Sequence, residues 1–176
     1  LVDAALAGAT MARVRAARSV HREQPFALAL PGPGAPLVNG IVDLLAIEDD
    51  GGALVVDYKT DHIGDADPEA VVASGYAIQR TIYALAALRS GAPRVEVVHL
   101  FLERPAEPAV ARYDRADAGA LEAQVAARAA GLVERRFPVA ETPHRELCAT
   151  CPGRGGLCSW PEERVLRPLA DAGAPR

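Results

Sequence analysis

Lysine is almost absent from this chain. Its 176 residues carry 19 basic side chains, and Lys59 is the single lysine among them. Arginine in place of lysine, together with abundant alanine, glycine and proline, is typical of a GC-rich coding sequence. The one lysine is therefore a candidate for a role that arginine fills poorly, because a compact ammonium can hydrogen-bond a water or a phosphate oxygen where a planar guanidinium does not fit.

Long apolar runs and an excess of positive charge are missing too. No run reaches the roughly 18 apolar residues that a transmembrane helix needs, so we expect a cytoplasmic protein with no membrane partner. The net charge of -4 argues against a chain that wraps nucleic acid through its overall field. The start at Leu1, with neither an initiator methionine nor a basic leader, predicts an N-terminally truncated piece of a longer polypeptide.

Cysteine is scarce and confined to one segment, at Cys148, Cys151 and Cys158. An odd number of cysteines so close together excludes a secreted disulfide framework. Their spacing in a Gly- and Pro-rich segment is typical of a metal-binding knuckle, but a tetrahedral ion would need a fourth ligand. Three alternatives stay open: a fourth ligand outside this sequence, a zinc site completed by His144, or cysteines that bind no metal.

Two carboxylates interrupt a predicted β-hairpin. Residues 41–47 and 53–58 are apolar and β-branched, and the acidic, glycine-ending segment between them is a turn signal. Asp43 lies in the first predicted strand, and Asp57 lies two residues before Lys59, so side chains 57 and 59 point to one face. An ionised acid in such a strand is costly to bury unless a cation or hydrogen bonds compensate it. The two acids beside a lysine therefore predict a divalent-metal site.

The other patterns predict an α/β fold with a mixed central sheet flanked by helices. We expect a helix over 1–18, a strand over 20–30, a helix from 67 to about 90, strands over 94–103 and 109–113, and a helix over 117–137. The core would span 1–142, followed by a Cys-rich tail over 143–176. We expect His99, inside the fourth strand, to be a sheet histidine with its hydrogen bonds satisfied rather than a metal ligand.

The motif residues resemble those of a known family. Gly-Ile-Val-Asp43, then Val-Val-Asp57-Tyr-Lys59-Thr-Asp61, then Tyr76-Ala-Ile-Gln79-Arg-Thr-Ile-Tyr83, is similar to the PD-(D/E)xK nuclease superfamily. Within it, residues 20–160 resemble the RecB/AddA-type nuclease domain at the C-terminus of bacterial helicase–nucleases. The resemblance implies a restriction-endonuclease-like fold and exonuclease-like, metal-dependent hydrolysis of DNA, coupled to an ATP-dependent helicase in double-strand break repair and recombination. Two rivals are a degenerate module that binds DNA or a partner without cutting, and a metal-free structural domain of a helicase.

The resemblance also implies roles for the motif residues. Asp43, Asp57 and the backbone carbonyl of Tyr58 would bind one or two Mg²⁺ or Mn²⁺ ions, since hard oxygen ligands suit them. Lys59 would orient the attacking water or offset charge in the transition state. Glu23 is a secondary candidate for the edge of the site, although a solvated charge is an equal interpretation. The family's further ligand, a His or Glu on a helix before the first strand, has no counterpart in residues 1–18.

Two features admit more than one interpretation. Tyr76, Gln79, Arg80 and Tyr83 fall on one helical face. Either this face covers the sheet with its tyrosine hydroxyls at the rim, or Gln79 and Tyr83 point at the metal site and the DNA backbone. Some relatives close a 4Fe–4S cluster with three C-terminal cysteines and a fourth far upstream. Such a cluster is one of the alternatives for Cys148, Cys151 and Cys158, and it would need a ligand outside this sequence.

Overall fold

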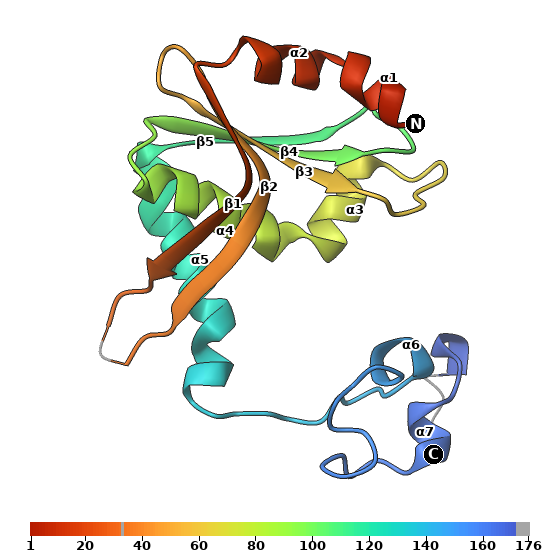
Figure 1. Ribbon diagram of the computed structural model, residues 1–176. Helices are drawn as coiled ribbons and strands as arrows, with labels where there is room; N and C mark the ends of the chain where they lie inside the picture. The colour runs from red at the N-terminus through yellow and green to blue at the C-terminus, as the bar shows by residue number, and fades with distance from the viewer. Residues whose placement is uncertain (33, 172–176) are drawn as a thin grey trace. The chain divides into compact units, whose positions relative to one another are not determined.

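The computed structural model describes residues 1–32 and 34–171, which fall into two compact units (Figure 1). The N-terminal unit is Leu1–Val133, and the C-terminal unit begins at Glu134. The boundary predicted after residue 142 lies nine residues after the end of the N-terminal unit at Val133. Both positions border or fall within residues 134–144, which contain neither helix nor strand. Within the described residues, no helix combines the length and the apolar character needed to cross a membrane.

The N-terminal unit is organised around a five-stranded sheet. Its strands lie in the order β1 (Ser19–Ala29), β2 (Leu37–Ile47), β3 (Ala53–Lys59), β4 (Arg94–Phe101) and β5 (Ala109–Asp114). Strands β3 and β4 are parallel, and all other neighbours are antiparallel, so the sheet is mixed, as the sequence predicted. The predicted turn joins β2 to β3 with Gly51 at φ +83°, a conformation that glycine adopts without strain.

Helices cover both faces of this sheet (Figure 1). On one face α1 (Val2–Ala7) and α2 (Ala9–Ala16) pack on the even-numbered side chains of β3, such as Leu54 and Val56. On the other face α4 (Ala77–Arg89) and α5 (Ala118–Val133), the latter entered through a 3-10 turn at Arg115–Asp117, pack on Val55. Because successive side chains of a strand alternate between faces, Asp57 and Lys59 belong to the α4 side.

Two helices predicted as continuous are each divided. Gly8 separates α1 from α2 with an extended backbone (φ −70°, ψ 165°). The helix predicted from 67 to about 90 is two helices, α3 (Pro68–Gly75) and α4, with Tyr76 between them at φ −124° and ψ 7°. The predicted start of α3 is confirmed, because Asp67 accepts a hydrogen bond from the Glu69 amide and a proline follows it. The break at Tyr76 was not predicted.

The C-terminal unit contains little regular structure. Within its described residues, 134–171, the elements are α6 (Arg145–Cys148), α7 (Glu162–Val165) and a 3-10 turn at Leu169–Asp171. Pro143, Cys148 and Val165 are buried in it. The indole of Trp160 donates a 2.7 Å hydrogen bond to the Ala140 carbonyl. This bond joins residues 134–144, which lie between α5 and α6, to the segment that carries the cysteines.

Candidate functional site

Asp43 and Asp57 meet where the β2–β3 ladder ends. The pairing runs from Ile47 opposite Ala53 to Leu44 opposite Val56, so the next position brings the two acids opposite each other. Here Asp43 Oδ2 accepts a 2.9 Å hydrogen bond from the Tyr58 amide. The Asp43 carboxylate thus accepts the hydrogen bond of the Tyr58 amide just beyond the last backbone pair of β2 and β3. This contact fixes the orientation of the Asp43 side chain beside β3.

The backbone carbonyl of Tyr58 points toward β2, the strand that carries Asp43. The N–H and C=O groups of one strand residue point toward the same neighbouring strand, and those of successive residues alternate. The Lys59 carbonyl accepts a 2.9 Å bond from Leu102, just beyond the end of β4, so the peptide groups of Tyr58 point toward β2. Its phenol lies on the α2 face, where the hydroxyl contacts Met11 Sδ at 3.4 Å. Tyr58 therefore offers the site its carbonyl rather than its side chain.

Asp57 is a buried acid with incomplete compensation. It is 2% exposed, and burial raises the pKa of its carboxyl, while Lys59 lowers that pKa and the charge of Asp43 raises it further. Lys59 Nζ lies 2.7 Å from Asp57 Oδ2. Apart from this ion pair, Asp57 Oδ2 has no hydrogen-bond partner in the described part of the chain. A buried carboxylate oxygen with one adjacent charge can accept a metal ion.

Lys59 is held by a chain of hydrogen bonds from α4. The side chain is 8% exposed, and its ammonium donates a 2.8 Å bond to Gln79 Oε1. The Gln79 amide donates to the Tyr83 hydroxyl at 3.0 Å, which in turn donates to the Ile41 carbonyl of β2 at 3.0 Å. These contacts link the lysine to two strands and one helix. Gln79 therefore points into the site, and Tyr83 supports it from behind.

Tyr83 is a neutral hydrogen-bonding group. Burial, reinforced by the charge of Asp57, raises its pKa to about 12, so the hydroxyl keeps its proton at neutral pH. It is 7% exposed, which rules out the interpretation that this hydroxyl lies at a solvated rim. A protonated phenol can both accept from Gln79 and donate to Ile41, as observed.

Arg80 and His99 depart from the expectations. Arg80 turns away from Gln79 and makes a bidentate pair with Glu69, at 2.6 and 2.9 Å, so the predicted four-residue face is not a single functional face. His99 is fully buried, as expected for a sheet histidine, but neither ring nitrogen has a hydrogen-bond partner among residues 1–32 and 34–171. The expectation of a satisfied histidine was wrong. Burial, aided by the charges of Arg80 and Lys59, lowers its pKa to about 4, so the ring is neutral at pH 7.

Glu23 lies beside Asp43 on the edge strand. The register sets Arg22 opposite Leu44 and Gln24 opposite Val42, so Glu23 falls opposite Asp43. Its φ of +48° is in the left-handed region, which is uncommon for a residue other than glycine and is found more often at functional sites. The side chain is exposed. Glu23 therefore lies next to Asp43 in the sheet, and its place at the edge of the site stays a prediction.

The oxygen donors fit a hard divalent cation. Asp43 and Asp57 supply carboxylates from adjacent strands, and the Tyr58 carbonyl faces the same side. Mg²⁺ commonly binds through one or two carboxylates and keeps several waters or substrate oxygens, so three protein oxygens suffice. The structure places no three His, Cys, Asp or Glu side chains of its described residues as a metal-binding group. The helices α1 and α2 pack on the opposite face of β3, and they add no ligand to this set.

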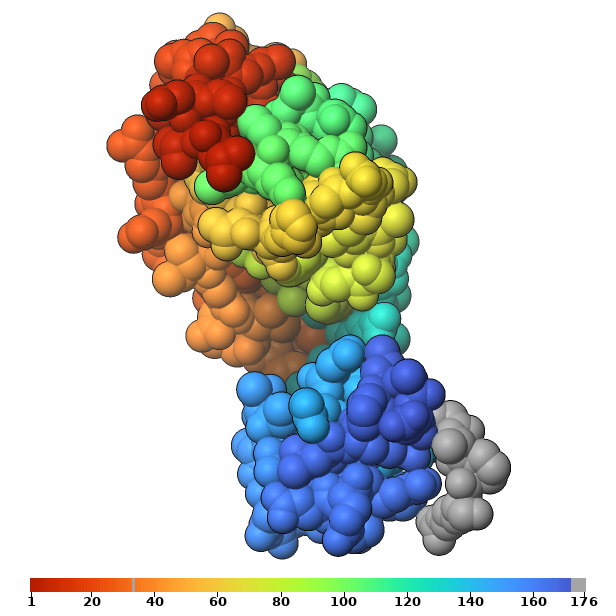
Figure 2. Space-filling model, turned by 90° about the vertical axis from the view of Figure 1, so that its right-hand side faces the viewer, coloured from red at the N-terminus to blue at the C-terminus, as the bar shows by residue number. Residues whose placement is uncertain are grey.

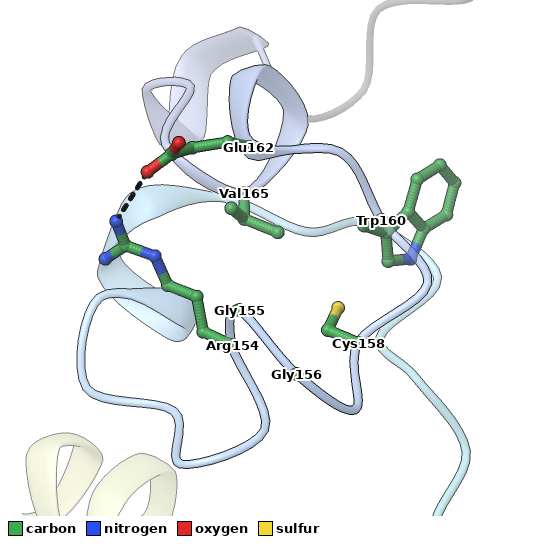
Figure 3. A pocket seen from close by; sticks show the side chains of 7 residues that line it. All are labelled: Arg154, Gly155, Gly156, Cys158, Trp160, Glu162 and Val165. Atoms are coloured by element: carbon green, nitrogen blue, oxygen red, sulfur yellow. Dashed lines mark hydrogen bonds and ion pairs between the residues drawn. The ribbon is translucent and has the colours of Figure 1, made fainter.

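The cysteines of the C-terminal unit are free thiols. Cys148 is buried, Cys151 is exposed and Cys158 is half-buried. Cys158 borders a hollow of about 270 Å³ that is also lined by Trp160 and Val165 and closed on one side by the Arg154–Glu162 pair at 3.0 Å (Figure 3). The buried Nδ1 of His144 has no hydrogen-bond partner in the described part of the chain. The structure thus provides no assembled site for the predicted zinc ion or iron–sulfur cluster among the residues it describes.

Two contacts at the site escaped the sequence analysis. Tyr76 lies with its ring centroid 3.9 Å from Lys59 Nζ, and its hydroxyl donates a 2.7 Å bond to Asp61 Oδ1. Asp61 lies two residues after Lys59, a spacing that could have drawn attention to it. The loop that carries Asp61 is held by Glu103, which accepts a 2.7 Å bond from the Ile63 amide. Figure 2 shows this loop (yellow) beside the segment that follows β4 (green) at the surface.

Helices on both faces of a mixed sheet, with acids on two adjacent strands, define a restriction-endonuclease-like α/β fold. The sequence profile of the PD-(D/E)XK nuclease superfamily matches residues 3–156, and the chain belongs to this superfamily.

Curated relatives add a narrower likeness. The chain is 38% identical over 107 residues to an ATP-dependent helicase/nuclease subunit of Desulforudis audaxviator (strain MP104C), covering 54% of this chain and 8% of that protein. It is 40% identical over 82 residues to the protein of the same name from Desulfitobacterium hafniense (strain DSM 10664 / DCB-2), covering 44% and 6%. The chain thus spans less than a tenth of the length of either relative.

A solved structure shows a weaker likeness. The crystal structure of SSO0001 aligns with 75% of this chain and 56% of its own, at 16% identity and a TM-score of 0.47. The fold assignment rests instead on the strand order and on the match to the superfamily.

Proposed function

We propose that this chain is the metal-dependent nuclease domain of a bacterial helicase–nuclease and that it hydrolyses phosphodiester bonds of DNA with Mg²⁺ or Mn²⁺. The observation that carries the proposal is the buried carboxylate of Asp57. It lies opposite Asp43, and apart from its 2.7 Å ion pair with Lys59 its Oδ2 has no hydrogen-bond partner within residues 1–32 and 34–171. Membership of a nuclease superfamily supports the same reaction.

In this proposal some residues bind the divalent ion and others position the ammonium of Lys59. Asp43, Asp57 and the Tyr58 carbonyl would hold the divalent ion, which would polarise the scissile phosphate and lower the pKa of a bound water. Lys59 would direct its ammonium at the attacking water or at a phosphate oxygen and would offset charge in the transition state. Gln79 fixes the ammonium, and Tyr83 fixes Gln79 against β2. Burial strengthens each of these electrostatic contacts because water is excluded.

The biological setting is also part of the proposal. Both curated relatives are named as helicase/nuclease subunits, and the likeness falls within a small part of each. We therefore infer an exonuclease-like activity coupled to an ATP-dependent helicase, carried in the same polypeptide or in a partner subunit, that acts in the cytoplasm in double-strand break repair and recombination. DNA is the expected substrate and partner, and no membrane is involved.

The cysteines fit a metal less well than the acids do. Three free thiols do not form a three-ligand group in the described part of the chain. A 4Fe–4S cluster at Cys148, Cys151 and Cys158 would need a fourth ligand from outside this sequence. It remains a proposal for a longer protein, and the hydrolysis described above does not depend on it.

Cleavage of a linear DNA labelled at one end tests the nuclease function. We expect cleavage with Mg²⁺ or Mn²⁺, none with a chelator, and a fall of at least about 100-fold for Asp57→Asn, the size expected when a preorganised electrostatic partner is removed. Asp49→Asn is the matched control, because Asp49 is exposed in the turn between β2 and β3. Circular dichroism would verify that both variants are folded. Undiminished cleavage by folded Asp57→Asn would reject the assignment, and DNA binding without cleavage by the unsubstituted protein would favour a non-cleaving module.

A further inference from the structure

We infer that Tyr76 is a positioning residue for Lys59: its ring, anchored by Asp61 and His99, fixes the ammonium against Asp57 and Gln79. This inference deepens the proposed nuclease function and rests on it. Neither the spacing of the motif residues nor the match to the superfamily assigns such a role to Tyr76. The contacts around its ring carry the inference.

The first step is the contact between the ring and the lysine. Lys59 Nζ lies 3.9 Å from the Tyr76 ring centroid, well inside the roughly 6 Å within which a cation is attracted to an aromatic face. The ammonium also has Asp57 Oδ2 at 2.7 Å and Gln79 Oε1 at 2.8 Å. Three different groups therefore surround the ammonium of a side chain that is 8% exposed.

The second step is that the ring is itself held. Tyr76 lies between α3 and α4 and has a non-helical backbone, with φ −124° and ψ 7°. Its hydroxyl donates a 2.7 Å bond to Asp61 Oδ1, and its ring lies 6.1 Å from the His99 ring at a tilt of 32°. Arg80 donates its amide to the Tyr76 carbonyl at 3.0 Å. The ring is thus fixed at its hydroxyl, at its face and at its backbone.

The third step concerns what Lys59 needs during hydrolysis. If Asp57 is shared with a divalent ion, the attraction between Asp57 and Lys59 weakens, because the ion competes for the carboxylate and repels the ammonium. Gln79 and Tyr76 are the two contacts that do not depend on the charge of Asp57. A lysine has a flexible stem with three rotatable donors, so an ammonium without the ring would occupy more positions. Tyr76 therefore keeps Lys59 in one place in the metal-loaded state.

Nuclear magnetic resonance can test the contact without any activity assay. Lys59 is the single lysine of the chain, so protein labelled with ¹³C-lysine has one set of lysine side-chain signals. An aromatic ring face shifts protons above it upfield, so we expect an upfield Lys59 ε-methylene signal in the full chain. Tyr76→Phe should keep this shift and Tyr76→Leu should lose it. Tyr113→Leu, the same exchange on β5, is the control that should leave it unchanged. An unshifted signal in the unsubstituted protein would overturn the inference.

Kinetics on linear DNA with Mg²⁺ test the consequence. We expect Tyr76→Leu to lower kcat by roughly 10- to 100-fold with little change in KM, the effect typical of lost support for a site residue, and Tyr76→Phe to retain most activity. A Tyr76→Leu protein with unchanged kcat, or with a raised KM alone, would overturn the positioning role. A shifted Lys59 signal in a protein that cleaves no DNA would reject the nuclease function and support the contact. The two failures are therefore distinguishable.

Discussion

The N-terminal and C-terminal units both carry residues that the sequence predicts as metal ligands, but only in the N-terminal unit are these residues held in place by a connected set of contacts. In the N-terminal unit the acids, the lysine and their supports are joined by contacts between 2.7 and 3.0 Å across β2, β3 and α4. In the C-terminal unit the three cysteines are free and differ in burial, and the segment that carries them consists of the short helix α6 followed by turns. A packed sheet fixes ligands before any ion binds, whereas a loop-rich segment needs the ion or tight packing to fix them.

This comparison ranks the effects of substitution. Residues in the connected site of the N-terminal unit should change activity greatly, because each contact depends on the others. Residues at the cysteines should change it little, because nothing in the proposed hydrolysis passes through them.

Of the substitutions that test this difference between the two units, Lys59→Arg should lower kcat the most. The charge is kept, but a planar guanidinium cannot take the place of an ammonium between Asp57, Gln79 and the Tyr76 ring. We expect a loss of about 100-fold in kcat, measured on linear DNA with Mg²⁺. Arg112→Lys, at an exposed arginine of β5, is the matched control with the opposite exchange and should cleave normally. Near-normal cleavage by Lys59→Arg would mean that the lysine supplies only a diffuse positive field.

Part of this site could be predicted from the sequence. The β-branched runs and the turn between them gave β2 and β3, and the acids inside those runs gave Asp43 and Asp57, because a charge in an apolar strand needs a local reason. The spacing of 57 and 59 correctly put both side chains on one face. These features depend on period and composition within a few residues of the chain.

The remainder depended on tertiary contacts. Gly75 can be tolerated in a helix, so nothing local required the chain to break at Tyr76. Arg80 left the predicted face because Glu69, on the other helix, offered a bidentate partner. In the described part of the chain the ring nitrogens of His99 have no hydrogen-bond partner. That outcome depends on which side chains of α3 and α4 lie over β4, and the periodicity of the sequence does not predict it. The boundary at Val133 likewise follows from where packing ends rather than from a change in composition.

The smallest effect is expected at the cysteines. Replacing Cys148, Cys151 and Cys158 together by serine should leave the cleavage rate within about twofold, since the proposed hydrolysis uses no group of the C-terminal unit. The unsubstituted chain, purified without oxygen, should show no iron–sulfur absorbance and no stoichiometric zinc. Elemental analysis and an absorbance spectrum would measure both. Stoichiometric zinc that is lost on His144→Ala would break the comparison, because the C-terminal unit would then hold a metal of its own.

The measurement that tests the central claim most directly is the binding of Mn²⁺ by this chain, followed by electron paramagnetic resonance or calorimetry in the absence of DNA. The account predicts saturable binding that Asp43→Asn or Asp57→Asn weakens by at least about 10-fold, while the exposed control Asp49→Asn leaves it unchanged. Equal binding by the unsubstituted protein and by both site variants would contradict the claim that Asp43 and Asp57 hold the ion.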